Sequence, residues 1–189
     1  MNYTTLALVF LAACAAADDF HDPLANGLDG DVAVTAGSLW TIEDGVLMPE
    51  RGEEGGYVVT RKQYGDVEIT LEFNPESETN SGVFARCQLP QEIAAESCYE
   101  FNIWDAHPNQ ESRTGAVVTI SPPVAIVNTE DNWNTMRVVL KGDHLQVWVN
   151  DTLTNDIRHA THTEGHIAFQ YGGMDGLVQF RNIRIQELD

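Results

Sequence analysis

Positive charge is what this sequence has least of. Only 10 Lys and Arg residues stand against 29 Asp and Glu residues, so the formal net charge is −19 at pH 7. A surface with this charge repels phosphate groups, which excludes nucleic acids and anionic membrane surfaces as expected partners. A neutral ligand such as a sugar is compatible with it. Because acidity also keeps a protein soluble, the charge by itself identifies no active site.

Long apolar runs are also scarce. The N-terminal stretch from Leu6 to Ala13 is too short for a membrane-spanning helix, which needs about 20 residues. It fits the hydrophobic segment of a secretory signal peptide over residues 1–13. Its end, Leu11-Ala12-Ala13-Cys14, resembles the lipobox of bacterial lipoproteins, in which the cysteine carries the lipid. The alternative is ordinary signal cleavage at Ala15-Ala16-Ala17.

Export to the cell envelope follows from either type of cleavage. Lipidation at Cys14 leaves residues 14–22 as a tether and residues 23–189 as a single domain, with membrane contact only through the lipid. Because Ala15 rather than Asp follows the cysteine, the predicted location is the bacterial outer membrane, facing the periplasm or the exterior. No protein partner is indicated.

Cysteines are few, and two of the three lie close together. Cys87 and Cys98 form an even pair once Cys14 is assigned to the lipid, and an exported protein meets an oxidising compartment. A disulfide between them is therefore predicted, and two free thiols packed in the core are the alternative. Without further thiols or a matched histidine pair, this spacing does not indicate zinc.

Helical periodicity is nearly absent, and short alternating runs take its place. Successive side chains of a strand point to opposite faces, so such runs indicate half-buried strands. Asp44-Gly45 and Gly142-Asp143-His144 supply turns, and only Glu92 to Glu96 suits a helical turn. The pattern predicts an all-β fold, an antiparallel two-sheet β-sandwich or jelly roll. The predicted strands are 40–43, 46–48, 57–61, 67–73, 82–87, 99–104, 116–120, 136–141, 145–150, 167–170 and 178–185.

Alternation also assigns faces around Glu100. Phe101 and Ile103 are expected in the core, so Glu100, Asn102 and Trp104 share the outer face. The preceding strand flanks the same cysteine loop. Its Val83 and Ala85 are expected in the core, and its Phe84 and Arg86 on the outer face.

This arrangement predicts a contact between Arg86 and Glu100, with Gln170 of a later strand also pointing outward. Planar polar groups bind sugar hydroxyls, and an aromatic ring covers the apolar face of a pyranose. The outer face therefore has the composition of a sugar site. An ordinary solvated sheet face is the alternative.

Several catalytic signatures are missing. There is no H-E-x-x-H, P-loop, Rossmann or G-x-S-x-G pattern, so metalloproteases, NTPases, dehydrogenases and serine hydrolases have no support. The E-x-D-x-x-E arrangement of glucanase-like jelly rolls is missing too, which makes direct glycosidase action a minor possibility. No cofactor is firmly implied, although a structural or catalytic divalent cation is compatible with the acidic loops; no EF-hand pattern occurs and metal ligands are not identified.

An ordered series of motifs resembles the 3-keto-disaccharide hydrolase domain family over about residues 23–189. The series is Trp40-x-x-x-Asp44-Gly45-x-Leu47, Tyr64-Gly65-Asp66, Asn80-Ser81-Gly82-Val83-x-x-Arg86, Tyr99-Glu100-x-x-Ile103-x-Asp105, Thr114-Gly115-Ala116, Trp133-Asn134-x-Met136, Gly165-x-Ile167-x-x-Gln170 and Phe180-Arg181-Asn182-Ile183-Arg184-Ile185.

The resemblance implies a concanavalin A-like jelly roll and a role in breaking down glycosides that are oxidised at C3 of a sugar ring. Such chemistry needs a base, an acid for the leaving oxygen and a group that stabilises enolate charge. The candidates for catalysis are Glu100, Arg86, Asp105 and His107, and those for binding sugar are Asn80, Phe84, Asn102, Trp104 and Gln170.

One departure from the family pattern bears on activity. Family members commonly carry an acidic residue, His and Gly after the late Gln, whereas this chain has Gln170-Tyr171-Gly172-Gly173. His166 shares the outward parity of Gln170 and is a substitute for that His or a plain surface residue. An enzyme on 3-keto glycosides is therefore the leading hypothesis. A non-catalytic, lectin-like sugar-binding domain and a structural surface domain are the alternatives.

Overall fold

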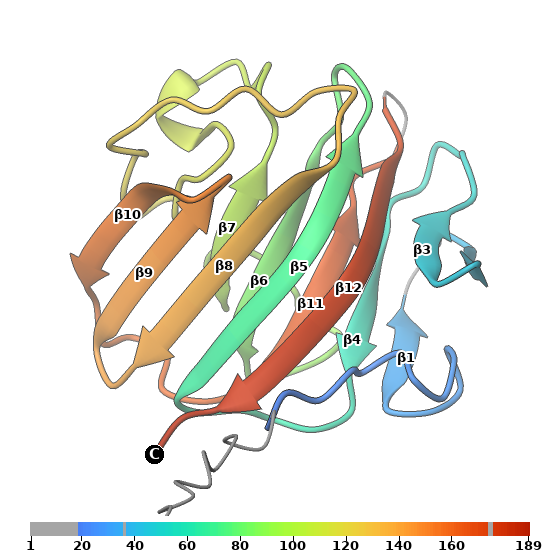
Figure 1. The fold of residues 1–189 in the computed structure, drawn as a ribbon, viewed down its shortest axis with the longest axis horizontal. Coiled ribbons are helices and arrows are strands. Elements are labelled where there is room, and N and C mark those ends of the chain that lie inside the picture. Colours follow the sequence, from blue (N-terminus) through green and yellow to red (C-terminus); the bar gives the residue numbers. More distant parts are fainter. Residues whose placement is uncertain (1–18, 36, 174–175) are drawn as a thin grey trace, which may run out of the picture.

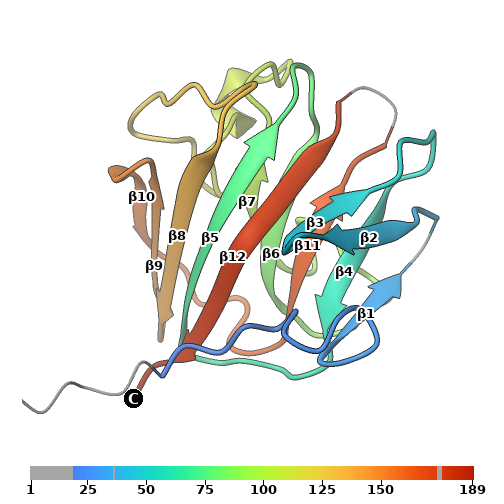
Figure 2. The same cartoon turned by 45° about the vertical axis from the view of Figure 1, so that its right-hand side comes forward.

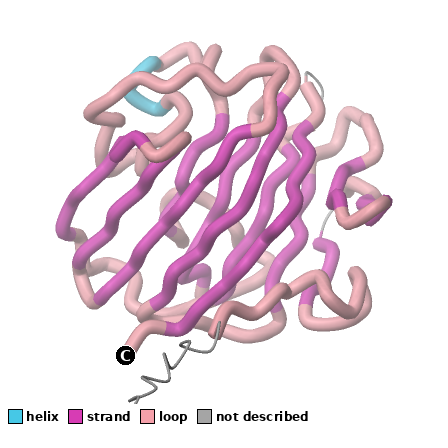
Figure 3. Tube along the Cα trace, viewed as in Figure 1, coloured by secondary structure: helices cyan, strands magenta, loops and turns pink. Residues whose placement is uncertain are grey.

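Strands make up nearly all of the regular structure. The computed structural model describes residues 19–35, 37–173 and 176–189, and Figure 3 shows that their one helix is short. That 3-10 helix is η1 (Gln110–Ser112). The strands are β1 (Val32–Thr35), β2 (Trp40–Glu43), β3 (Val46–Pro49), β4 (Gly56–Thr60), β5 (Val67–Pro75), β6 (Ser81–Cys87), β7 (Tyr99–Ile103), β8 (Asn134–Lys141), β9 (His144–Val149), β10 (Thr152–Arg158), β11 (His166–Tyr171) and β12 (Val178–Glu187).

The strands form two layers. A five-stranded sheet has the order β1-β4-β11-β6-β7, and a seven-stranded sheet has the order β10-β9-β8-β5-β12-β3-β2. In Figure 1 five strands of the larger sheet cross in front of the five-stranded sheet, namely β10, β9, β8, β5 and β12. Figure 2 shows β2 and β3 beside β12. Neighbouring strands pair antiparallel throughout the described ladders, for example β5 with β8 and β12. The predicted all-β, two-sheet antiparallel sandwich is confirmed.

The core lies between the sheets and follows the alternation in the sequence. Along β5 the side chains of Val67, Ile69, Leu71 and Phe73 are buried, while the residues between them are half-exposed. The predicted inward residues of the other sheet are buried in the same cluster. They are Val83, Ala85, Phe101, Ile103, Ile167 and Phe169. Burial of apolar area on this scale is the main stabilising term of the fold.

Tight turns fix the register of two hairpins. Asp44 and Gly45 both have positive φ, 50° and 78°, as a two-residue turn between β2 and β3 requires. Gly142, at φ 57°, begins the turn from β8 to β9. Both predicted turns are confirmed.

The strand prediction failed in the connections. Residues 116–120 form no strand, because Thr119 at φ 65° turns the chain and only Val117 makes isolated bridges, to Phe101 and Ser121. Residues 92–96 form no helix, and the segment turns at Ala94, whose carbonyl accepts from Cys98 N at 3.0 Å.

Two strands escaped prediction for identifiable reasons. Strand β1 is a short edge strand of four residues. Strand β10 contains few apolar residues and a bulge between Leu153 and Asn155, so its alternation is broken.

Contacts of the domain begin slightly before the predicted boundary at Pro23. His21 exchanges backbone hydrogen bonds with Ile185 at 2.7 and 2.8 Å. The predicted signal peptide and Cys14 lie outside the described residues. Within residues 19–35, 37–173 and 176–189, no helix has the length and apolar character needed to cross a membrane.

Candidate functional site

The outer face of the five-stranded sheet brings Glu100 together with residues from three other strands. One row across this face runs through Val59, Ala168, Phe84 and Glu100, as the pairing of β4, β11, β6 and β7 dictates. In the neighbouring rows Tyr57 pairs with Gln170, and Gly82 pairs with Asn102.

Glu100 lies low on the sheet because Gly82 has no side chain. A Cβ built at Gly82 would lie 3.5 Å from Glu100 Oε1 and 3.3 Å from the carbonyl oxygen of Phe101. The carboxylate therefore occupies the space that a larger residue at position 82 would fill.

The Glu100 carboxylate is desolvated and unpaired. Neither a hydrogen bond nor an ion pair joins it to any residue that the structure describes. Burial, together with the nearby negative charge of Glu96, raises the pKa of Glu100 to about 7. A carboxylate with this pKa exchanges protons readily near neutral pH, which is the property that a general acid or base needs.

Tyr57 and Gln170 form a polar pair next to Glu100. Gln170 Nε2 donates to Tyr57 Oη at 3.3 Å, and Tyr57 Oη donates to the carbonyl oxygen of Ile93 at 3.2 Å. Burial raises the pKa of Tyr57, and the negative charge of Glu100 adds to this effect while the Gln170 hydrogen bond opposes it. The Oε1 atom of Gln170 is buried and has no partner among the described residues.

A loop closed by a disulfide covers this face. The predicted bond between Cys87 and Cys98 is present and bounds the 88–98 segment. Ile93 of that segment packs on a small second cluster made of Val59, Phe84, Ala168 and the two cysteines. Phe84 is on the outer face as predicted, but it is buried beneath the segment and meets Tyr57 edge to face, with ring centroids 5.6 Å apart. It is therefore a packing residue of this face and not an open sugar platform.

The predicted contact between Arg86 and Glu100 is wrong. Arg86 has φ 56°, next to an irregularity in the pairing of β6 with β11, so the alternation of faces breaks at this residue. Its guanidinium is buried and donates to the carbonyl oxygens of Gly65 at 3.2 Å, Gly142 at 2.8 Å and His162 at 3.0 Å, and to Asp66 Oδ1 at 3.2 Å. Arg86 thus joins three loops at one end of the sandwich.

Asp105, in the loop after β7, holds a distant segment of the chain at Thr129. Its carboxylate accepts from the backbone N and the hydroxyl of Thr129, and Arg113 Nη2 lies 3.7 Å away. Only 8% of the Asp105 side chain is exposed. With its oxygens held in this way, Asp105 anchors the loop, and its role as an acid or base stays a prediction.

The other predicted residues near this loop are partly covered. Asn102 is buried, and its Nδ2 donates to the carbonyl oxygen of Ser112, so the amide is not open to ligand in this structure. Trp104 and His107 are both half-buried, and their rings are in contact with centroids 4.5 Å apart. His107 Nδ1 contacts the backbone of Asn109, both its N at 3.0 Å and its O at 2.8 Å.

Asn80 lies directly before β6, beside Gly172. Its carbonyl oxygen accepts from Gly172 N at 2.9 Å, and a Cβ at Gly172 would lie only 2.7 Å from Asn80 Nδ2. The missing side chain at position 172 is therefore what leaves room for Asn80. Tyr171 points the other way, into the core, and its hydroxyl is held by the backbone of Gly52.

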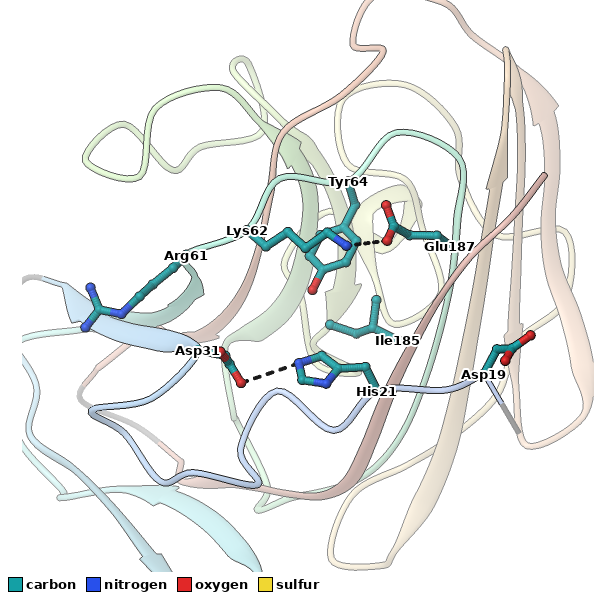
Figure 4. Close-up of a pocket in the computed structure, with 8 residues that line it drawn as sticks. All are labelled: Asp19, His21, Asp31, Arg61, Lys62, Tyr64, Ile185 and Glu187. Carbon is teal, nitrogen blue, oxygen red and sulfur yellow. Dashed lines mark hydrogen bonds and ion pairs between the residues drawn. The ribbon is translucent and has the colours of Figure 1, made fainter. Parts of the chain in front are cut away.

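A sizeable cavity lies away from Glu100. It measures about 700 Å³ and is lined by residues of the N-terminal segment, the β4–β5 connection and the end of β12. Figure 4 shows two pairs among its charged side chains, His21 with Asp31 and Lys62 with Glu187. The carboxylate of Asp19 also lines the cavity, but Asp19 is exposed, whereas Glu100 is half-buried.

Metal ligands are not evident in the described parts of the chain. No group of three or more His, Cys, Asp or Glu side chains is placed there to hold a metal ion. The compatibility of the chain with a divalent cation stays a prediction.

The alternation in the sequence placed Glu100 and Gln170 on the right face, but it did not single out Tyr57. The alternation of β4 is hidden because Val58, which faces the core, and Val59, which faces outward, are both apolar and both buried. Only the pairing of β4 with β11 shows that Tyr57 lies beside Gln170.

Solved structures with this fold include carbohydrate-related proteins. A candidate glycosyl hydrolase from Parabacteroides distasonis ATCC 8503 superposes with a TM-score of 0.71 at 24% identity, over 82% of this chain and 93% of that one. The carbohydrate-binding module CBM66 from Bacillus subtilis gives a TM-score of 0.63 at 12% identity, over 82% and 95% of the two chains. The VIP36 exoplasmic/lumenal domain in its Ca²⁺/Man-bound form gives 0.60 at 9% identity, over 84% of each. These likenesses establish the class, a lectin-like β-sandwich.

The sequence defines the family within that class. The profile of the 3-keto-alpha-glucoside-1,2-lyase-like domain matches residues 22–186, and the chain belongs to this family. It is a domain of the glycosyl hydrolase-like or carbohydrate-binding kind. No curated protein sequence matches the chain.

Proposed function

We propose that this protein is an exported enzyme that cleaves 3-keto glycosides, with Glu100 as the residue that moves the proton. The observation that carries the proposal is the half-buried, unpaired Glu100 carboxylate on the outer face of the five-stranded sheet. Family membership supports the substrate class, because the family is described by a lyase acting on a 3-keto-alpha-glucoside.

The chemistry requires one well-placed base. A ketone at C3 acidifies the hydrogen on C2, so ionised Glu100 can take that proton and leave an enolate. The electron pair then forms the C1–C2 double bond as the bond from C1 to the glycosidic oxygen breaks. The leaving oxygen gains a proton, which protonated Glu100 or water supplies. Addition of water across the double bond gives the hydrolysed sugar.

With a pKa of about 7, Glu100 is ionised in roughly half of the molecules at neutral pH, so it can act both as base and as acid. The groups next to Glu100 bind the sugar and do not transfer protons. We expect the amide of Gln170 and the hydroxyl of Tyr57 to hydrogen-bond sugar oxygens once the ligand is bound.

A non-catalytic sugar-binding domain is the second candidate. What favours it is that two of the four predicted catalytic side chains are engaged elsewhere, Arg86 in joining loops and Asp105 in holding Thr129. Turnover separates the two functions, because a binding domain retains saturable binding without product.

The enzyme is tested by incubating the exported domain with a panel of 3-keto disaccharides and their unoxidised parents. Only the keto compounds should release product, and Glu100→Gln should lower turnover at least about a hundredfold, the usual scale for general acid–base catalysis. Glu72→Gln, on the outer face of the other sheet, is the matched control and should keep wild-type turnover. Full activity in Glu100→Gln would place the site elsewhere.

We also propose that the protein is anchored in the bacterial envelope through lipid on Cys14. The motif Leu11-Ala12-Ala13-Cys14 supports this. Mass spectrometry of the membrane fraction should find diacylglyceryl-modified Cys14 at the mature N-terminus. An unmodified N-terminus at Asp18 would instead show cleavage after Ala17 by the ordinary signal peptidase.

A further inference from the structure

The 88–98 segment is stiff within itself and weakly joined to the sheet beneath it. Its own backbone groups bond to one another, Glu92 N to Leu89 O at 3.1 Å and Ser97 N to Ala94 O at 3.0 Å. The Ser97 hydroxyl adds contacts to the carbonyl oxygens of Glu92 and Ala94. The disulfide between Cys87 and Cys98 fixes both ends of the segment. The segment is therefore held together as one unit by its own bonds.

Contacts from the middle of the segment to the rest of the described chain are few. One hydrogen bond crosses from residues 89–97 to the sheet, from Tyr57 Oη to the carbonyl oxygen of Ile93. One apolar side chain, that of Ile93, packs on the cluster beneath. A single neutral hydrogen bond contributes about 1 kcal/mol net, so opening these contacts costs little compared with unfolding the domain.

The bond that the segment makes occupies a donor of the proposed site. Tyr57 Oη accepts from Gln170 Nε2, so its own proton is free to go to one acceptor, which is the Ile93 carbonyl oxygen in this structure. That oxygen stands where a ligand oxygen, a ketone or hydroxyl of the sugar, would accept the same proton. The segment also brings the negative charge of Glu96 close enough to Glu100 to help raise the pKa of that carboxyl.

We propose that Tyr57 is a substrate-binding residue and that the 88–98 segment is an autoinhibitory lid, whose Ile93 carbonyl competes with a sugar oxygen for the Tyr57 hydroxyl. This rests on the proposed sugar site around Glu100. Ligand binding then requires the open form, so the apparent affinity is the intrinsic affinity reduced by the fraction of open molecules. Weakening the lid without touching Tyr57 improves binding, whereas removing the Tyr57 hydroxyl weakens the lid and the ligand contact together.

Three variants of the full domain separate these effects. Ile93→Ala keeps the backbone carbonyl but removes the packing that holds the lid. Tyr57→Phe removes the hydroxyl. Leu89→Ala is the matched control, because Leu89 belongs to the same segment, is 51% exposed and does not pack on the cluster beneath it.

Two measurements are made on each variant. Hydrogen–deuterium exchange of peptides from the 88–98 segment reports lid opening, and steady-state kinetics on a 3-keto disaccharide report KM and kcat. We expect exchange to rise at least about fivefold in both Ile93→Ala and Tyr57→Phe and to stay unchanged in Leu89→Ala. KM should fall severalfold in Ile93→Ala and rise about fivefold in Tyr57→Phe, with kcat within about twofold of wild type in both.

Two outcomes would overturn the proposal. If Ile93→Ala speeds exchange but leaves KM unchanged or raises it, the segment does not compete with the ligand. If Tyr57→Phe lowers KM as Ile93→Ala does, Tyr57 only holds the lid and does not bind sugar.

Exchange also separates this proposal from the proposed activity. Adding the same 3-keto disaccharide to the Glu100→Gln variant should speed exchange of the 88–98 segment, because ligand displaces the lid without being consumed. If the segment responds to the ligand but the wild type shows no turnover, the lid proposal stands and the proposed activity is wrong. If the wild type shows turnover but the segment does not respond to the ligand, the proposed activity stands and the lid proposal is wrong.

Discussion

The two outer faces of the sandwich differ in whether their glutamate carboxylates are paired with arginine. On the seven-stranded sheet, Arg137 Nε and Nη2 donate to the two carboxylate oxygens of Glu68 at 2.7 and 2.8 Å. Arg181 donates twice to Glu72, and both arginines also lie over tryptophan rings, Arg137 over Trp148 and Arg181 over Trp133. The carboxylates of Glu68 and Glu72 on this face are thus held in exposed or half-exposed pairs.

On the five-stranded sheet, the carboxylate of Glu100 has no such partner in the described structure and is mostly buried. Pairing lowers the pKa of Glu72, through hydrogen bonds from Asn182 and Arg181, whereas burial raises that of Glu100. The same residue type thus stays ionised on one face and titrates near neutral pH on the other. A paired face suits solubility, and an unpaired, desolvated carboxylate suits proton transfer.

The largest expected difference between the two sheets concerns their arginines. Arg86→Met leaves Asp66 and three loop carbonyls without their donor, so the free energy of unfolding should fall by about 3 kcal/mol or more. Arg137→Met, on the seven-stranded sheet, breaks an exposed pair and should cost less than about 1 kcal/mol. Chemical denaturation of both variants measures the difference. Wild-type stability with lost turnover in Arg86→Met would return Arg86 to the catalytic site.

The pH dependence of stability should have opposite signs at the two glutamates. Because the folded pKa of Glu100 is raised to about 7, its contribution to stability is fully present below its ordinary value and is lost as the pH rises through 7. Glu100→Gln should therefore be more stable than wild type at pH 8, by about 1–3 kcal/mol, and equal to it near pH 4.

Glu72 is the control for that measurement. Its pKa is lowered, so its contribution is present above its ordinary value and is lost as the pH falls through the lowered pKa. Glu72→Gln should be less stable than wild type at pH 7, and the difference should vanish in acid. Thermal unfolding of the three proteins across this range measures both effects, and equal slopes for all three would contradict the burial of Glu100.

The smallest expected effect comes from one added methyl group. Gly82→Ala places a Cβ in ordinary contact with Glu100 Oε1, at 3.5 Å, but only 3.3 Å from the Phe101 carbonyl oxygen, so the β7 backbone next to Glu100 must shift by a few tenths of an ångström. Turnover of a keto glycoside should fall about tenfold, because proton transfer is sensitive to position. Gly52→Ala is the matched control, since a Cβ there meets nothing within 4 Å. Unchanged kcat in Gly82→Ala would show that Glu100 does not act from this position.

Strands and turns were predictable where local chemistry was strong. The alternation in β5 and the Asp44-Gly45 turn each indicate one conformation from a few neighbouring residues. The prediction failed at residues 116–120, where β-branched residues suggested a strand but the chain turns at Thr119. It also missed β10, whose bulge and buried polar residues depend on contacts with the 115–122 connection, including Asn155 Nδ2 to the Gly115 carbonyl oxygen at 2.8 Å.

The candidate site was predictable in part. Parity placed Glu100 and Gln170 on one face, and counting cysteines paired Cys87 with Cys98. The alternation of faces breaks at Arg86, because Arg86 itself is in the left-handed region and its side chain points away from Glu100. The contact of Asp105 with Thr129 was not predicted, because the two residues lie 24 positions apart along the chain. Neither contact has a local signature.

The sequence by itself determined the all-β class, the inward and outward residues of regular strands and the family, because these depend on periodicity and on motif order along the chain. Only the tertiary structure decided that Tyr57 lies beside Gln170, that Ile93 covers them and that Glu100 is desolvated. The physical reason is that burial and hydrogen bonding depend on neighbours in space. Those neighbours are supplied by strand pairing and by a folded loop, and no stretch of sequence specifies them alone.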